Sequence, residues 1–166
     1  MSIDDLTWGA IQILALNEEE SLAIRKYKKA SARILSKEYI SYREIMTFPK
    51  QNDFGIFRIK RIKEIVEKNY YGYQLRYYDI SHEGIPPLLQ FMIIDSKEVI
   101  LASHRGANIP IEGEPYLAVQ IPDIVFWFQD YYNAIWHEAI IIKNAGTMAN
   151  NQEINKIDER LHSNNT

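Results

Sequence analysis

The hydrophobic positions of residues 42–80 change period twice, from strand to helix and back to strand. Residues 42–48 are rich in β-branched and aromatic side chains and stop at Pro49, which indicates a strand. Residues 56–66 repeat isoleucine and valine at helical spacing, and residues 73–80 return to an aromatic-rich, strand-like stretch. A strand, a helix and a strand in this order predict a βαβ unit, whose two strands run parallel with a right-handed crossover.

Residues 88–104 contain a long apolar run interrupted by one polar turn. The turn Asp95–Glu98 separates two apolar stretches, and this pattern predicts a buried hairpin. Gln90 is the polar exception, and a buried glutamine needs hydrogen-bond partners. Residues 105–120 contain two glycines and two prolines with little periodicity, so they predict a long loop over one end of the sheet.

An aromatic helix is predicted after this loop. Asp123 is in position to cap a helix over residues 124–143, which Gly146 would close. Its apolar residues cover more than one face, so we expect the helix to be buried on two sides. Trp127 and Trp136 are accordingly predicted to be structural core residues.

The two ends of the chain are predicted to lie outside the central α/β unit. Asp4 or Asp5 is in position to cap a short helix that ends near residue 16, and a second helix is expected over residues 17–36. The sequence therefore divides into N-terminal helices (1–41), an α/β core (42–146) and a polar tail (147–166), expected to be a frayed helix or disordered.

Composition narrows the classes of protein that fit. The net charge is −3 at pH 7, with a pI of about 5.8, so there is no overall positive field to attract nucleic acid. The chain has no cysteine, which excludes disulfides, thiolate metal sites and a cysteine nucleophile. The acidic N-terminus and the lack of a long apolar run predict no signal peptide and no membrane span, hence a cytoplasmic protein.

A resemblance to a known family appears at the hairpin. The order of strand, helix, strand, hairpin, loop and tryptophan-bearing helix resembles one half of the phospholipase D superfamily, over roughly residues 42–143. The motif of that superfamily is His-x-Lys, four residues, Asp, six residues, Gly-Ser-x-Asn. Asp95 stands at the motif aspartate, and Ala102-Ser103 stands in place of Gly-Ser. Counting back from Asp95 puts Leu88 at the histidine and Gln90 at the lysine.

The resemblance implies a fold and a lost activity. The expected fold is a phospholipase D-like α/β half: a mixed sheet with a βαβ unit and a hairpin, helices on both faces, and two helices before it. In the family the histidine is the nucleophile and the lysine neutralises the phosphate. Leu88 cannot attack phosphorus and Gln90 carries no charge. The chain therefore resembles the catalytically inactive sensory domains of some transcription regulators, and a regulatory ligand-sensing or protein-interaction role is expected.

The same resemblance suggests a pocket for a small polar or anionic ligand. The hairpin end, the end of the first expected strand and the following loop would line it, and one arginine of the second expected strand is a candidate anion contact. The candidate ligand-binding residues are Thr47, Arg76, Gln90, Ser103, His104, Arg105 and Asn108. No pair of the four histidines has the spacing of a metal site, so neither a metal nor a cofactor is expected.

Two other functions stay open at this point. One is a phosphodiesterase or nuclease in which His82 or His104 replaces the nucleophile. The other is a nucleic-acid-binding regulator that uses a local basic helix, whose cations are Arg25, Lys26, Lys28, Lys29 and Arg33; a solvated helix face is the plainer interpretation of that run. A homodimer is expected, because the family builds its site from two halves and because residues 124–142 carry surplus apolar surface.

Overall fold

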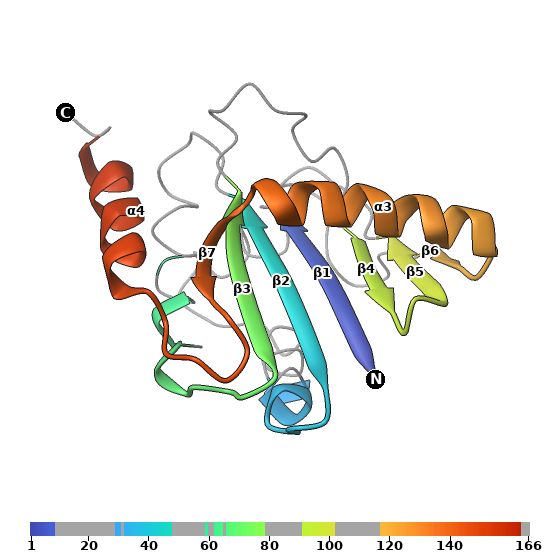
Figure 1. The fold of residues 1–166 in the computed structure, drawn as a ribbon, viewed down its shortest axis with the longest axis horizontal. Helices are drawn as coiled ribbons and strands as arrows, with labels where there is room; N and C mark the ends of the chain where they lie inside the picture. The colour runs from blue at the N-terminus through green and yellow to red at the C-terminus, as the bar shows by residue number, and fades with distance from the viewer. Residues whose placement is uncertain are drawn as a thin grey trace, which may run out of the picture.

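The computed structural model of the chain shows a single mixed β-sheet with helices on both faces (Figure 1). The structure describes residues 1–8, 29–30, 32–47, 59, 62–64, 66–78, 91–101 and 117–163. Within these residues no helix is long and apolar enough to cross a membrane.

Among the described residues, seven strands form the sheet in the order β6-β5-β4-β1-β2-β3-β7. The strands are β1 (Ser2–Trp8), β2 (Ser41–Thr47), β3 (Tyr73–Tyr78), β4 (Phe91–Ile94), β5 (Glu98–Leu101), β6 (Leu117–Val119) and β7 (Ile140–Lys143). The three central strands β1, β2 and β3 are parallel, and the other neighbours pair antiparallel. The parallel pair β2 and β3 and the hairpin β4–β5 were both expected from the sequence, and the structure confirms them.

The N-terminal segment is a strand, and the expectation of a first helix capped by Asp4 or Asp5 is wrong over residues 2–8. β1 lies in the middle of the sheet, between β2 and β4. Ile3 and Leu6 are 2% and 0% exposed, and both aspartates are buried as well. The strand forms because its alternating side chains find apolar or hydrogen-bonding neighbours on both faces of the sheet. The second expected helix agrees at its end, since residues 32–35 are helical.

One face of the sheet is covered by the helix α3 (Pro122–Glu138). Its buried side chains pack on Leu6, Ile45, Phe91 and neighbouring apolar residues of the sheet. The phenyl rings of Phe91 and Phe128 meet edge to face, with centroids 4.9 Å apart. This packing explains why the sheet residues facing α3 are mostly apolar or aromatic.

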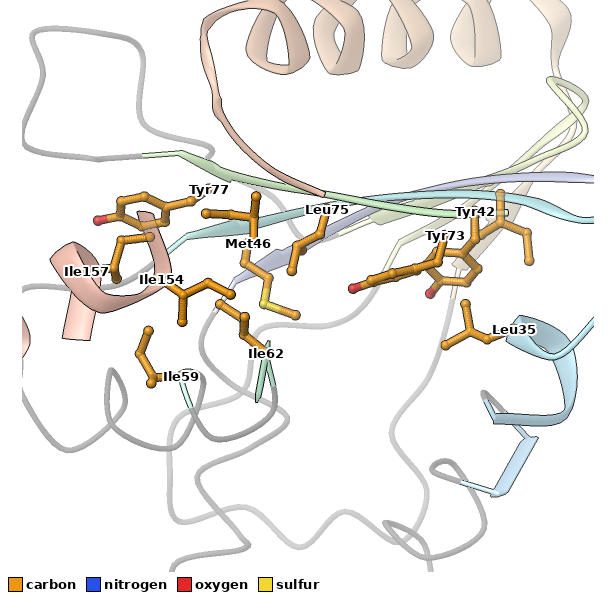
Figure 2. Close-up of a cluster of buried hydrophobic side chains, with 12 residues drawn as sticks. Leu35, Tyr42, Met46, Ile59, Ile62, Tyr73, Leu75, Tyr77, Ile154 and Ile157 are labelled. Atoms are coloured by element: carbon orange, nitrogen blue, oxygen red, sulfur yellow. The ribbon is translucent and has the colours of Figure 1, made fainter. Parts of the chain in front are cut away.

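The opposite face is covered by helical residues near Leu35 and Ile62 and by the helix α4 (Asn151–Ser163). Figure 2 shows the resulting cluster, in which Ile154 and Ile157 of α4 lie among buried side chains of β2 and β3, Met46 and Tyr77 included. Both α4 isoleucines are 3% exposed or less. Residues 151–163 thus form a helix, one of the two expectations for the polar tail, and the alternative of a disordered tail is wrong for these residues, because α4 presents an apolar stripe that completes this core.

The end of the aromatic helix also differs from the expectation. α3 stops at Glu138, and Ile140–Lys143 form β7 instead, because three successive isoleucines suit an extended edge strand paired with β3. Asp123 lies in the first turn, but the cap position is Ile121, which makes no side-chain cap. Gly146, at φ +67°, closes a turn after β7 rather than the helix. The end of the expected 105–120 loop is likewise a strand, β6.

Candidate functional site

The carboxyl ends of the three parallel strands meet at one edge of the sheet. The final residues Trp8, Thr47 and Tyr78 of β1, β2 and β3 are neighbours in the register. The first residue of β4, Phe91, pairs with Leu6, and the last residue of β5, Leu101, pairs with Phe91. We call this row of strand ends the carboxyl edge. In open α/β sheets such edges are where ligands bind.

The candidate pocket residues relate to this edge in different ways. Thr47 ends β2 at the edge, and the structure describes its backbone only. Gln90 comes directly before β4, and Ser103 follows the end of β5 by two residues. Five candidates lie outside the residues that the structure describes: Gln90, Ser103, His104, Arg105 and Asn108. Leu88 and His82 lie outside them as well.

Asp95, at the motif aspartate, lies far from the carboxyl edge. It forms the hairpin turn with Ser96, both at positive φ, and β4 begins at the carboxyl edge and ends at this turn. Its Oδ1 accepts a hydrogen bond of 2.6 Å from the backbone N–H of Ser2. Asp95 therefore ties the hairpin to the start of β1.

Arg76, the candidate anion contact, lies beneath the last turns of α3. Its guanidinium stacks over the ring of Trp136 at 4.3 Å and donates from Nη1 to the carbonyl oxygen of that residue. Its buried Nε finds no hydrogen-bond partner among the residues that the structure describes. Burial lowers the pKa of Arg76, and the nearby Arg43 lowers it further. The described contacts of this arginine are thus with α3, whose C-terminal carbonyls attract a cation.

A buried ion pair, Arg43 with Asp4, lies next to Arg76. Neither of its residues is among the candidate ligand-binding residues predicted from the sequence. Arg43 donates from Nε and Nη2 to the two carboxylate oxygens of Asp4, at 2.6 and 2.8 Å. The same guanidinium lies over the rings of Tyr132 and Trp136, at 5.1 and 5.2 Å. The hydrogen bonds to Asp4 raise the pKa of Arg43, against the effect of burial. Charged residues inside otherwise apolar strands were the signal that could have pointed to this pair.

Asp4 neutralises Arg43, whereas no carboxylate among the described residues forms an ion pair with Arg76. Among the described residues under α3 there are thus two guanidinium groups, those of Arg43 and Arg76, and one carboxylate paired with either of them, that of Asp4.

A pair of buried carboxylates lies on the other face of the sheet. Asp5 and Glu44 are register partners on β1 and β2, 3% and 1% exposed. The hydroxyl of Tyr42 donates to Asp5 Oδ2 at 2.6 Å, and that of Tyr73 donates to Glu44 Oε2 at 2.7 Å. These bonds satisfy carboxylates that would otherwise be costly to bury. In the described part of the chain, no three histidine or acidic side chains are grouped as metal ligands.

Aromatic side chains of α3 border the carboxyl edge. The ring of Tyr131 lies 6.0 Å from that of Phe91, and the ring of Trp127 stacks on Tyr131. Burial raises the pKa of Tyr78, the last residue of β3, and the nearby negative charge of Glu138 raises it further. The edge is thus walled on the α3 side by aromatic rings.

Comparisons with known proteins give structural similarities only. No protein-family model and no curated protein sequence matches the chain. Its fold is similar to the crystal structure of Nuc from Salmonella typhimurium, a phospholipase D family member, with a TM-score of 0.49 and 13% identity over 86% of this chain and 82% of that one.

A second similar structure is TrmBL2, an archaeal chromatin protein described as showing a novel mode of DNA binding. The TM-score is 0.44 and the identity 17%, over 84% of this chain. The chain spans 44% of the length of that protein's chain.

Proposed function

We propose that the chain is a phospholipase D-like domain that binds a small polar or anionic ligand at the carboxyl edge and does not hydrolyse phosphodiesters. The observation that carries this proposal is topological. The strand ends that meet at the edge include Thr47, and β4 and β5 begin and end there, one residue after Gln90 and two residues before Ser103 in the sequence. Three separate segments that end in, or continue into, candidate residues therefore reach one edge of the sheet.

The absence of hydrolysis follows from side-chain chemistry at the motif positions. Leu88 has no atom that can attack phosphorus, and Gln90 offers hydrogen bonds without a positive charge. A neutral hydrogen-bonding group next to a cation still binds an oxyanion, as many ligand sites do. Arg105 is the first arginine or lysine in the sequence after the end of β5.

Titration with inorganic phosphate, followed by calorimetry, tests the proposed site. We expect saturable binding that Gln90→Ala and Arg105→Ala each weaken by roughly tenfold, as the loss of one hydrogen bond to a charged group predicts. Arg33→Ala is the matched control, because Arg33 is an exposed cation before β2. Equal losses in Arg33→Ala and Arg105→Ala would contradict a site at the carboxyl edge.

A regulatory role requires that the bound state be transmitted, and we propose that it is transmitted through a homodimer. Two copies that face each other across a twofold axis would enclose a ligand that a single edge leaves open. Sedimentation at micromolar concentration is expected to give about twice the 19.5 kDa chain mass. A measured mass near that of one chain would contradict the proposal of a pocket shared between two copies.

A further inference from the structure

The solvent-facing side of α3 combines exposed apolar rings with acidic charge. Phe126 and Trp127 are 64% and 57% exposed. Three carboxylates, those of Asp123, Asp130 and Glu138, are also exposed on this helix, which contains no lysine or arginine. The exposed Leu117, Ile121 and Ile124 precede or begin the helix, so half of the exposed large hydrophobic residues of the described chain lie within residues 117–127. Exposed apolar clusters of this kind mark interaction surfaces.

Trp127 is held in one orientation from its inner side. Its ring is parallel to that of Tyr131, with an interplanar angle of 1° and centroids 5.7 Å apart. The ring of Phe128 meets it at 90° and 4.9 Å. An indole fixed in this way and still more than half exposed presents a preorganised aromatic surface to solvent.

The charges around this indole select the kind of group that can bind it. Asp123 precedes Trp127 by four residues and Asp130 follows it by three, so both lie next to it on the helix surface. Neither carboxylate forms an ion pair with any residue that the structure describes. An aromatic ring flanked by carboxylates attracts a planar cation, and a guanidinium is the side-chain group with that shape.

The inner side of the same helix already binds guanidinium groups in this way. Arg43 lies over Tyr132 and Trp136, and Arg76 lies over Trp136. Arg43 also pairs with a carboxylate, Asp4. The outer side offers the same combination of ring and carboxylate at Trp127, where no cation of the described residues lies over the ring.

We propose that the surface formed by Asp123, Phe126, Trp127 and Asp130 docks a basic partner segment, with an arginine side chain stacked on Trp127. The exposed isoleucines at the start of α3 would contact apolar residues of the same segment. Charge favours this occupant over two others: a second copy of α3 would bring carboxylates against carboxylates, and nucleic acid would bring phosphates against them. The docking surface is independent of the ligand proposed at the carboxyl edge.

Fluorescence anisotropy with three labelled synthetic peptides tests the proposal. The peptides are identical amphipathic helices whose charged positions hold arginine, lysine or glutamate. The intact chain is expected to bind the arginine peptide most tightly, the lysine peptide less tightly and the glutamate peptide not measurably. Trp127→Leu, which keeps an apolar side chain but removes the ring, is expected to weaken arginine-peptide binding by roughly 3- to 30-fold, with a smaller effect on the lysine peptide.

Matched variants separate this surface from general attraction to an acidic protein. Asp123→Asn with Asp130→Asn is expected to weaken binding and to reduce its salt dependence. Glu64→Gln with Glu67→Gln removes two exposed carboxylates elsewhere, and Tyr39→Leu removes a ring that is 73% exposed before β2; both are expected to leave binding within about twofold. Equal binding of the arginine and glutamate peptides, or no change in Trp127→Leu, would overturn the proposal. So would a dimer that Trp127→Leu dissociates, because a second copy would then occupy the surface.

Discussion

Two tryptophans of α3 show how one helix serves two purposes. Trp136 is 5% exposed and covers the guanidinium groups of Arg43 and Arg76, whereas Trp127 is 57% exposed. The two residues lie about two and a half helical turns apart, which places them on opposite sides of the helix. The inner tryptophan holds a charged cluster in the core, and the outer one remains available to a partner. The same residue type therefore has a structural role on one side of the helix and a candidate binding role on the other.

The largest effect is expected from truncating the inner tryptophan. Trp136→Ala leaves a cavity and removes the ring over two arginines, so the free energy of unfolding should fall by about 3–5 kcal/mol. Urea denaturation followed by circular dichroism measures this loss. An unchanged unfolding midpoint would mean that the ring does not cover the arginines as described.

A smaller but still large effect is expected from the buried ion pair under that ring. Asp4→Asn removes the charge that neutralises Arg43 and should lower the free energy of unfolding by about 2–3 kcal/mol. This loss is smaller than for a fully buried pair, because 24% of the Arg43 side chain is exposed. Glu153→Gln, in an exposed pair with Lys156, is the matched control and should cost about 0.5 kcal/mol or less. Equal losses in the two variants would show that the Asp4–Arg43 pair is not buried as described.

Alkaline pH should distinguish the inner side of α3 from the outer side. Burial raises the pKa of Tyr132 well above 10.0, and the negative charge of Asp4 adds to this. Above about pH 10 the unfolded chain loses this proton while the folded chain keeps it, so stability falls as pH rises. Tyr132→Phe should flatten the decline by up to about 1.4 kcal/mol per pH unit, and Trp127→Ala should leave it unchanged. The same slope in wild type and Tyr132→Phe would refute this assignment.

The smallest effect on stability is expected at the outer tryptophan. Trp127→Ala removes an exposed ring and its stacking on Tyr131, which should cost about 1 kcal/mol or less. Thermal unfolding measures it alongside Trp136→Ala. A loss as large as that of Trp136→Ala would mean that Trp127 is a core residue, and would remove the docking surface proposed for it.

The parts of the fold that the sequence predicts well have local patterns. The βαβ unit and the hairpin β4–β5 follow from periodicity within short segments and from a polar turn. β1 was missed because its polar residues are satisfied from far along the chain, Asp4 by Arg43 and Asp5 by Tyr42. In isolation, two consecutive acids near an N-terminus are typical of an exposed helix start.

The difference between local patterns and contacts from far along the chain also explains which features of the candidate site the sequence could predict. The resemblance to the phospholipase D superfamily suggested a pocket between the end of strand 42–48, the hairpin end and the following loop, and the described strand ends Thr47, Phe91 and Leu101 lie at one edge of the sheet. The contacts of Arg76 could not be predicted, because they depend on how α3 crosses the sheet. The difference in exposure between Trp127 and Trp136 depends on the same crossing. The carboxylates of Asp123, Asp130 and Glu138 mark the outer side of α3, but Phe126 and Trp127 lie on that side too, so the sequence suggested a helix buried on two sides.

The central claim, binding at the carboxyl edge without hydrolysis, can be tested in one phosphorus NMR experiment. A dinucleoside monophosphate serves as the probe, because its phosphodiester signal reports both binding and cleavage. We expect the intact chain to broaden or shift that signal, Gln90→Ala to restore it towards its free position, and no monoester signal to develop over time. A monoester signal that His104→Ala abolishes would contradict the loss of activity, and an unperturbed diester signal with the intact chain would contradict the binding site.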